Sequence, residues 1–383
     1  MVLRTGPAGK HILDVTLFFT TTSGGVRRYL LEKHHWLREH TRLKHTVLVP
    51  GRHTAGLPYD VMSFASPPIP FGGGYRLPLR MRAFREQLAR LSPDLVEVGD
   101  PYHVAWHALR VARERRVPAI AFCHSDIIML ARSILGKRGG RAAARYAAKL
   151  YDRFDRVLAP SEVVAGRLRE AGLCNVEIQP LGVDVELLTP AAREPELREN
   201  LGIPRRARLL VFAGRLSPEK RTGDLAAALR LLPPNYHLLV VGAARAGRHG
   251  DRLQFLEYQQ DRRKLARVLA SCDAFVHAGD QETFGLVALE AMACGLPVVA
   301  ARAGALAELV DRSVGETFMA RDPADLASAV SRLFERDLAE IRRAARRRAE
   351  ARSWDSAFSI MLGRYTRLLG TSRPSWSRVT HAG

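Results

Sequence analysis

The sequence has few cysteines, and their spacing gives no sign of a metal site or a disulfide framework. Its 383 residues include four cysteines, none of them in a CxxC pair: Cys123, Cys174, Cys272 and Cys294. Zinc sites and disulfide-stabilised scaffolds both need closely patterned cysteines. We therefore expect no metal site and a reducing, cytoplasmic setting.

Long apolar runs are also missing. No stretch approaches the ~20 residues that a membrane-spanning helix requires. The first ten residues, MVLRTGPAGK, lack the apolar core of a signal peptide. Ile12 to Phe19 is apolar but short, and it is predicted as a first strand. With 47% hydrophobic residues, a chain of this length can form two domains, each with its own core.

Acidic residues are under-represented relative to basic ones. The chain has 59 Lys and Arg against 39 Asp and Glu, a formal net charge of +20. Arginine outnumbers lysine 52 to 7, a bias that often reflects genome composition and says little about phosphate chemistry. The excess of base predicts polyanionic surroundings: nucleic acid, anionic lipid or a nucleotide diphosphate.

Short buried strands alternate with helical stretches in both halves of the chain. In the first half they end near Phe19, Val49, Val98, Cys123 and Ser161; in the second half, near Gly214, Val241, His277 and Ala300. Such alternation predicts an α/β fold with parallel sheets. We expect two Rossmann-like domains, at 1–183 and 184–355, facing a central cleft. Residues 356–383 are predicted as a C-terminal helix and tail that packs back on the N-terminal domain.

The most informative stretch runs from Gln281 to Ala300. Glu282 and Glu290 flank seven uncharged residues, and Glu290 lies in an apolar helical run where an unpaired carboxylate is costly. Thr283 is predicted as the N-cap and Gly295 as the residue after the helix. Free amides at the helix start favour an anion. The pattern fits a nucleotide-sugar site, or a buried helix whose glutamates pair with arginines.

Other polar residues follow predicted strands, where ligands bind in parallel sheets. Gly24 and Gly25 precede a helix, and allow close backbone approach or simply a tight turn. Arg215 and Lys220 follow a strand of the second half, and two cations there can neutralise a diphosphate. His124 ends an N-terminal strand. Glu97 and Asp100 are similarly placed, where they can hold an acceptor hydroxyl.

A basic stripe is predicted on a helix in the first half. Its members recur every three to four residues: Arg141, Arg145, Lys149, Arg153 and Arg156. An apolar stripe runs beside it through Tyr146, Leu150, Phe154 and Val157. The simpler interpretation is a core-facing helix with a solvated basic edge. The sharper one is contact with an anionic membrane surface through Arg141, Arg145, Lys149 and Arg153.

These motifs together resemble the retaining glycosyltransferases of family 4, which have the GT-B fold. The segment from Glu282 to Glu290 is similar to the family's E-x7-E signature. Gly24-Gly25-Val26 resembles its glycine loop, and Gly214-Arg215-Leu216 with Lys220 its diphosphate clamp. His124 matches a histidine at a strand end, and Leu181 to Asp184 the interdomain linker. The resemblance covers nearly the whole chain in the right order.

The resemblance implies a role for each of these residues. Glu290 would hold the ribose; Glu282 would face the donor sugar, beside the start of the helix at Phe284, Gly285 and Leu286. Arg215, Lys220 and the Gly25 amide would bind the diphosphate, with Gly24 in the same loop. His124 would contact the sugar. The family retains anomeric configuration and uses no metal or other cofactor, so no residue is assigned as a nucleophile.

By resemblance, the donor is a UDP- or GDP-sugar, with GDP-mannose slightly favoured. The acceptor is a lipid, a lipid-linked saccharide or a saccharide, and the protein would act in the cytoplasm or on the inner face of the membrane. Arg221 stands where the family usually has glycine, so the clamp differs locally. Two alternatives remain at this point: another nucleotide-sugar enzyme, such as an epimerase or a phosphorylase, and a basic binding protein without catalysis. No specific nucleic-acid motif is present.

Overall fold

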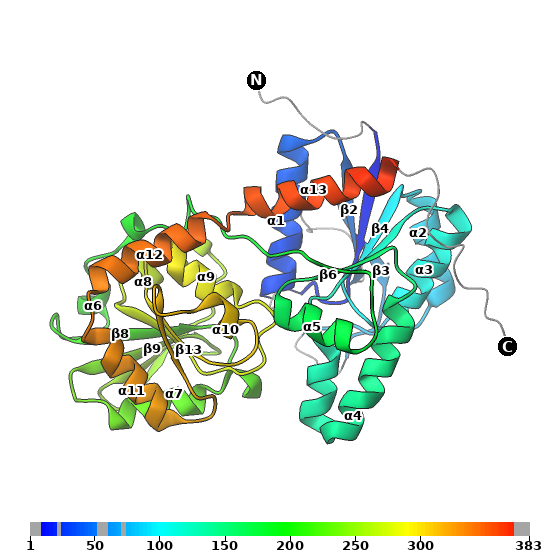
Figure 1. The fold of residues 1–383 in the computed structure, drawn as a ribbon. Coiled ribbons are helices and arrows are strands. Elements are labelled where there is room, and N and C mark those ends of the chain that lie inside the picture. Colours follow the sequence, from blue (N-terminus) through cyan, green and yellow to red (C-terminus); the bar gives the residue numbers. More distant parts are fainter. Residues whose placement is uncertain (1–8, 21–23, 52–59, 70–73, 371–383) are drawn as a thin grey trace. The chain divides into compact units, whose positions relative to one another are not determined.

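The computed structural model describes residues 9–20, 24–51, 60–69 and 74–370, and divides into two compact units (Figure 1). Unit 1 comprises Met1–Pro180 with Ala357–Gly383, and unit 2 comprises Leu181–Ser356. Each unit is a sheet with helices on both faces. Of the expected C-terminal segment, residues 371–383 lie outside the described part of the chain.

The sheet of unit 1 is parallel throughout, in the order β3-β2-β1-β4-β5-β6-β7. Its strands are β1 (His11–Val15), β2 (Lys44–Gly51), β3 (Val61–Ala65), β4 (Leu95–Val98), β5 (Ala119–Phe122), β6 (Arg156–Ala159) and β7 (Val176–Ile178). Its helices are α1 (Gly25–His40), α2 (Met81–Arg90), α3 (His103–Arg115), α4 (Ile127–Tyr151) and α5 (Glu162–Glu170).

The sheet of unit 2 has the order β10-β11-β9-β8-β12-β13-β14 and is parallel except where β10 pairs with β11. Its strands are β8 (Arg208–Ala213), β9 (Tyr236–Ala243), β10 (Gly247–His249), β11 (Leu253–Glu257), β12 (Ala274–His277), β13 (Val298–Ala301) and β14 (Gly315–Phe318). Its helices are α6 (Leu197–Asn200), α7 (Thr222–Leu231), α8 (Arg262–Ala270), α9 (Leu286–Ala293), α10 (Leu306–Leu309), α11 (Pro323–Phe334) and α12 (Leu338–Glu350).

The predicted α/β class is confirmed, and the strand order places the strand-end residues. In both sheets the chain moves outward on one side of the first strand and then resumes on the other side. This leaves a switch point between β1 and β4 in unit 1, and between β8 and β12 in unit 2. Ligands bind outside the carboxyl ends of strands at such points.

Some local predictions were wrong. The first strand ends at Val15 rather than Phe19, because the chain turns where Leu17 donates its backbone N–H to Asp100. The edge strands β3, β7, β10 and β14, and β11 beside β10, were not predicted. Edge strands are short and only partly buried, so their hydrophobic pattern is weak.

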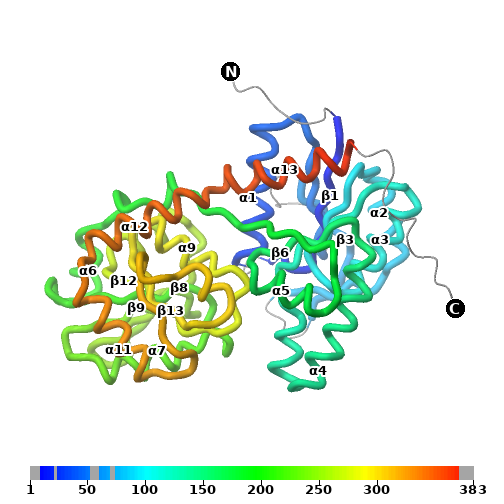
Figure 2. Tube along the Cα trace, viewed as in Figure 1, coloured from blue at the N-terminus to red at the C-terminus, as the bar shows by residue number. Residues whose placement is uncertain are grey.

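The final helix α13 (Trp354–Gly370) lies against α1 in unit 1, as both traces show (Figures 1 and 2). The Phe358 ring lies 5.9 Å from Trp36 and 5.8 Å from Tyr29. The side-chain amide of Gln179 donates to the Ala357 carbonyl at 2.9 Å. Aromatic packing and a buried hydrogen bond therefore hold the C-terminal helix on this unit.

The prediction of one continuous basic helical stripe was also wrong. Helix α4 ends at Tyr151, because the next residues turn into β6. Arg153 instead packs its guanidinium 5.5 Å from the centre of the Trp106 ring. Arg156 opens β6 and pairs with Glu177 at 2.8 Å. Only Arg141, Arg145 and Lys149 remain on the helix.

Candidate functional site

The predicted acidic and basic residues of unit 2 meet at the carboxyl ends of β8 and β12. The Lys220 ammonium forms an ion pair with Glu282, although the two residues are far apart in sequence. His277, the last residue of β12, places its Nε2 3.0 Å from Oε1 of the same carboxylate. The switch point of this sheet therefore holds a partly buried anion between a cation and an imidazole.

This environment keeps Glu282 ionised. Burial alone would raise the pKa of its carboxyl, but Lys220 and His277 outweigh that effect and hold the pKa well below its usual range. A carboxylate that stays charged inside a protein can stabilise positive charge that develops nearby. The arrangement suits a reaction in which a cationic centre forms for a short time.

His277 is a site residue that our sequence reasoning missed. Its Nδ1 accepts a hydrogen bond from the Gly279 backbone N–H at 3.0 Å. Nε2 therefore carries the proton and donates to Glu282, which fixes the neutral tautomer. The signal was available, because His277, like His124, lies at the end of a strand predicted from the sequence, but the sequence does not tell which of these histidines meets a carboxylate.

Arg215 lies one residue beyond the tight turn that ends β8. Gly214 has φ 151°, and a Cβ added at Gly242 would lie 2.0 Å from the Gly214 carbonyl oxygen. Only glycine therefore allows β8 and β9 to end this closely together. Arg215 is exposed, and within the described part of the chain its guanidinium has no hydrogen-bond or ion-pair partner. It is available to an anion from solvent.

Helix α9 begins later than predicted. Gly285, with φ 85°, is the N-cap in place of Thr283, because the chain needs a left-handed residue to turn into the helix. Phe284 and Leu286 flank it and are each 8% exposed. The predicted end is confirmed: Gly295 has φ 75° just past the last turn. The first amides of α9 have no partner within the helix, and their dipole favours an anion.

Glu290 lies inside α9 with a fully buried side chain. No hydrogen bond joins it to Lys220 or His277 among those found in the described residues. The structure thus supports a buried position for Glu290 without assigning it a ligand.

In unit 1, Gly24 is the N-cap of α1 and Gly25 its first residue. Gly24 has an ordinary φ of −75°. A Cβ added there would meet no atom of the described residues within 4 Å. Among the described residues, neither the φ of Gly24 nor its packing requires glycine at this position. The preceding residues 21–23 lie outside the described part.

His124 follows β5 and is held between aromatic rings. Its imidazole stacks on Phe122 with a centroid distance of 4.2 Å and an interplanar angle of 7°. Tyr29 lies 5.0 Å away in an edge orientation. Burial lowers the pKa of His124 to about 3, against a smaller opposing effect of Asp14. The imidazole is therefore neutral at physiological pH, so it can act as a hydrogen-bonding group but not as a cation.

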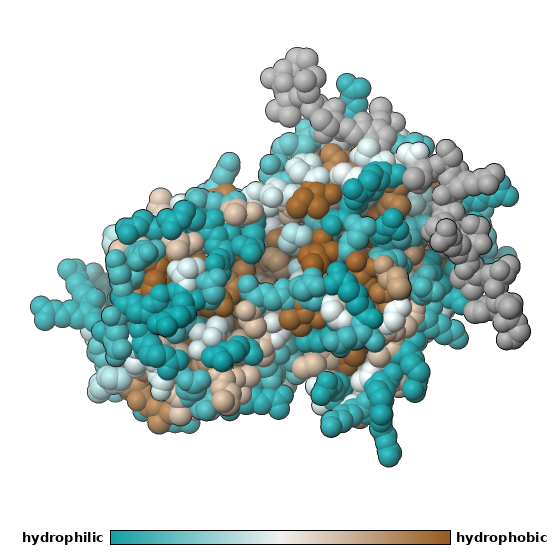
Figure 3. All heavy atoms as spheres, in the orientation of Figure 1, coloured by the Kyte–Doolittle hydropathy of each residue, from teal (hydrophilic) through white to brown (hydrophobic). Residues whose placement is uncertain are grey.

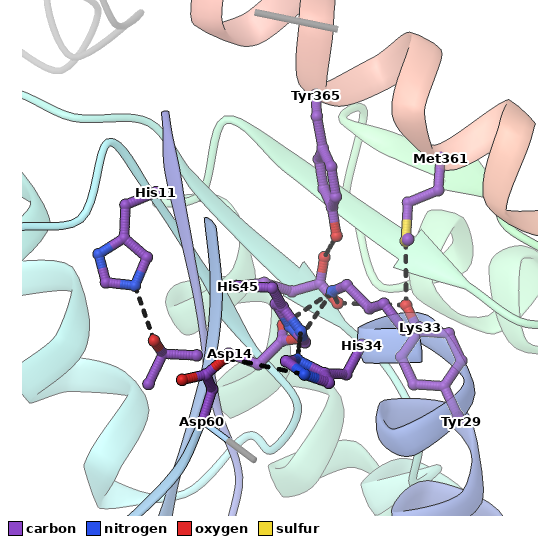
Figure 4. A network of polar contacts seen from close by, with 11 residues as sticks. His11, Asp14, Tyr29, Lys33, His34, His45, Asp60, Met361 and Tyr365 are labelled. Carbon is purple, nitrogen blue, oxygen red and sulfur yellow. Dashed lines mark hydrogen bonds and ion pairs between the residues drawn. The ribbon is translucent and has the colours of Figure 1, made fainter. Parts of the chain in front are cut away.

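Glu97 does not hold an acceptor hydroxyl, because a buried network occupies it (Figure 4). Its Oε2 accepts from the Tyr365 hydroxyl of α13 at 2.5 Å, and its Oε1 lies 3.0 Å from the Lys33 ammonium. Lys33 also contacts Asp14 at 2.8 Å, and Asp14 accepts from His45 at 2.6 Å. The network joins β1, β2, β4, α1 and α13, so its role is structural.

Asp100 lies at the end of β4 with 1% of its surface exposed. One oxygen accepts from the Leu17 backbone N–H. Burial raises the pKa of its carboxyl to about 7, with the Leu17 and Thr16 hydrogen bonds opposing the shift. Asp100 can therefore change protonation near neutral pH.

A cavity of about 500 Å³ lies elsewhere in unit 1, between β3 and α2. Its lining includes Met62, Phe64, Arg80, Phe84 and Arg90, and none of the predicted site residues. The described residues contain no group of three or more His, Cys, Asp or Glu side chains that could hold a metal ion. The candidate site thus consists of the Lys220–Glu282–His277 cluster with Arg215 and the start of α9.

Two family models match the chain, one in each half. The model described as glycosyl transferases group 1 matches residues 193–352, and that described as glycosyltransferase family 4 matches residues 23–187. The first includes β8 and β12, on both sides of the switch point of unit 2, whereas the second begins after β1 and includes β4 of unit 1.

Curated relatives cover most of the chain. A GDP-mannose-dependent alpha-(1-6)-phosphatidylinositol dimannoside mannosyltransferase of Mycobacterium tuberculosis is 32% identical over 369 residues, which cover 92% of this chain and 95% of the relative. A GDP-mannose-dependent alpha-mannosyltransferase of Mycolicibacterium smegmatis is 32% identical over 292 residues, covering 74% and 76%.

Solved structures share the fold. Anabaena HepE in complex with UDP and glucose gives a TM-score of 0.76 at 22% identity, covering 94% of this chain and all of that one. Sucrose-phosphate synthase from Thermosynechococcus elongatus gives 0.78 at 20% identity, covering 95% and 100%. At these identities the likeness establishes the architecture alone.

Proposed function

The chain belongs to the family 4 glycosyltransferases of GT-B fold, and from this premise we propose that it transfers mannose from GDP-mannose, with retention of anomeric configuration and without a metal ion. Family membership favours transfer over the epimerase, phosphorylase and non-catalytic alternatives. The choice of GDP-mannose as donor rests on the 32% identity, over 92% of the chain, to a relative named for GDP-mannose.

The unit 2 cluster supplies the electrostatics of this reaction. Arg215 and Lys220, with the amides at the start of α9, bind the diphosphate and stabilise its charge as the bond to the sugar breaks. Glu282 stays ionised and stabilises the positive charge that develops on the sugar ring. Lys220 is paired with Glu282, so an arriving diphosphate shares a cation that is already in place. Glu290 holds the ribose.

The transfer needs no protein nucleophile. The bond between the sugar carbon and the diphosphate oxygen breaks, and a bond from the acceptor oxygen forms on the same face of the ring. The acceptor proton passes to the departing phosphate oxygen. In unit 1 we assign the Gly25 amide, with Gly24 beside it, to the diphosphate, and neutral His124 to a hydroxyl of the donor sugar. These residues position the groups.

We propose a lipid or lipid-linked saccharide as the acceptor, at the inner face of the membrane. The support is the relative named for phosphatidylinositol dimannoside, together with the net charge of +20. No helix among the described residues is long and apolar enough to cross a membrane. On this proposal the protein reaches its acceptor from the membrane surface.

Thermal shift in EDTA against GDP, UDP, ADP and their sugars tests the donor. A ligand at about 100 times its dissociation constant stabilises the fold by ~2.7 kcal/mol. We expect GDP and GDP-mannose to raise the melting temperature more than the other nucleotides and nucleotide sugars do. Transfer is then measured against phosphatidylinositol mannosides, diacylglycerol glycosides and free saccharides, with the product anomer read by NMR. Selection of UDP, a strict metal requirement or an inverted product would each contradict the proposal.

A further inference from the structure

Helix α4 is a hairpin rather than a straight rod. Gly136 interrupts it with φ 66° and ψ −163°. The two arms pack tightly around this break: a Cβ added at Gly139 would lie 2.3 Å from the Leu135 Cβ, and one at Gly140 would lie 3.0 Å from the Arg132 Cβ. The glycines let the second arm fold back against the first. The turn at Gly136 therefore joins the two arms of α4, which Figure 1 shows side by side.

The first arm exposes large aliphatic side chains beside this turn. Ile134 is 70% exposed, Leu135 69% and Leu130 45%. Three such side chains within six residues form a concentrated apolar patch, whereas singly scattered ones are ordinary. The second arm does the opposite, since its Ala143, Ala147 and Leu150 are buried in the core of unit 1. The fold thus anchors the hairpin by one arm and presents the other.

The charge around this patch has a single sign. Helix α4 contains no Asp or Glu, and its cations are Arg132, Lys137, Arg138, Arg141, Arg145 and Lys149. Asp126, just before the helix, is paired with Arg167. Hydrophilic residues cover the outer end of α4 on the face seen in Figure 3. The aliphatic patch therefore lies on a helix whose charged residues are all cations.

We propose that the tip of the α4 hairpin, residues 130–145, docks the protein on an anionic lipid bilayer. Leu130, Ile134 and Leu135 enter the boundary between head groups and acyl chains, and the surrounding cations pair with head-group phosphates. The inference rests on the proposed function, which places the acceptor in a membrane. It replaces the predicted Arg141–Arg153 stripe, because Arg153 packs on Trp106.

The aliphatic patch decides between a bilayer and other polyanions. A nucleic-acid backbone is bound by cations alone, and its affinity falls steeply with salt. Exposed isoleucine and leucine contribute nothing to that contact. A bilayer binds both the aliphatic side chains and the cations, because the apolar groups leave water while the cations stay at the head groups. A second copy of the chain would present the same cations on its own α4 and be repelled.

Vesicle sedimentation of the full chain tests the proposal. One set of vesicles is phosphatidylcholine with phosphatidylglycerol as about a third of the lipid. Binding to these vesicles is compared with binding to vesicles of pure phosphatidylcholine. We expect clear preference for the anionic vesicles. Ile134→Ser with Leu135→Ser should weaken binding about tenfold. Lys137→Gln with Arg138→Gln should weaken it about 25-fold, since each cation near the surface contributes about fivefold.

Matched controls lie in unit 2. Leu231→Ser removes a leucine that is 61% exposed on α7, and Arg205→Gln with Arg206→Gln removes two exposed cations. Both should leave vesicle binding unchanged. Equal effects of tip and control variants, an unchanged affinity in the Ile134→Ser, Leu135→Ser variant, or a dimer that the same variant dissociates would overturn the proposal. So would a loss of DNA binding in the Ile134→Ser, Leu135→Ser variant that matches its loss of vesicle binding.

Failure of this inference is distinguishable from failure of the proposed function. The tip variants should bind GDP-mannose normally and transfer mannose normally to a water-soluble acceptor, losing rate only with acceptors embedded in vesicles. Normal vesicle binding without GDP-mannose binding would reject the function and leave the docking surface intact. Normal transfer to vesicle acceptors by the tip variants would reject the docking surface and leave the function intact.

Discussion

The Nε2 atom of His277 lies 3.0 Å from Oε1 of Glu282, while its Nδ1 accepts from the Gly279 backbone. The histidine therefore orients the carboxylate that we place beside the donor sugar. We expect His277→Ala to lower kcat by about 10- to 100-fold, because this carboxylate loses its fixed position. The dissociation constant for GDP should change little. A matching loss of GDP affinity and kcat would argue against a positioning role.

Arg215 is exposed and has no partner among the described residues, so its removal should not disturb the fold. We expect Arg215→Ala to weaken GDP binding by about tenfold or more, since a charge-assisted contact to the diphosphate is lost. Isothermal titration calorimetry measures this. Arg206→Ala, also an exposed arginine of unit 2, is the control. Equal GDP affinity in the two variants would remove Arg215 from the site.

Arg221 has φ 50°, a left-handed backbone conformation that residues other than glycine rarely adopt. The family resemblance already marks this position as one where glycine is usual. We expect Arg221→Gly to be more stable than Arg221→Ala by about 1 kcal/mol, because both lose the ion pair to Asp224 and only alanine keeps the strain. Urea unfolding compares them. At Arg230, inside helix α7, the order should reverse.

Asp100 should make stability depend on pH near neutrality. Burial raises the pKa of its carboxyl from 3.8 to about 7, so between these values the folded state holds a proton that the unfolded state releases. Its contribution to stability is therefore full below about pH 4 and is lost as the pH rises to about 7. Asp100→Asn should gain stability relative to the wild type over that window, by at most about 1.4 kcal/mol per pH unit. The prediction would be contradicted if the free energy of unfolding in urea differed between Asp100→Asn and the wild type by the same amount at about pH 5 and about pH 7.

The Tyr365 hydroxyl connects α13 to the buried Glu97. Tyr365→Phe leaves a buried carboxylate oxygen without this donor, and we expect a loss of about 1–3 kcal/mol in the free energy of unfolding. Amide hydrogen exchange in α13 should rise with it. Tyr146→Phe is the control, because that hydroxyl donates to the neutral Pro101 carbonyl. An equal or greater loss in the control would show that the charged network is not what holds α13.

The sequence by itself predicted the fold class, because buried parallel strands and amphipathic helices are local patterns. It also placed Arg215, Lys220 and Glu282 at the carboxyl ends of strands, where a parallel sheet binds ligands. It misplaced the N-cap of α9, since Thr283 is a good cap by composition, whereas the chain path required the left-handed Gly285.

Only the tertiary structure decided which of these residues meet. Lys220 and His277 converge on one carboxylate, and Lys33 with Tyr365 withdraws Glu97 from any site. It also folded α4 into a hairpin whose aliphatic tip faces solvent. The physical reason is how far apart in the sequence the interacting residues lie. Burial of apolar side chains follows a periodic pattern along the chain, while pairing of buried charges depends on strand order and packing, which join residues distant in sequence.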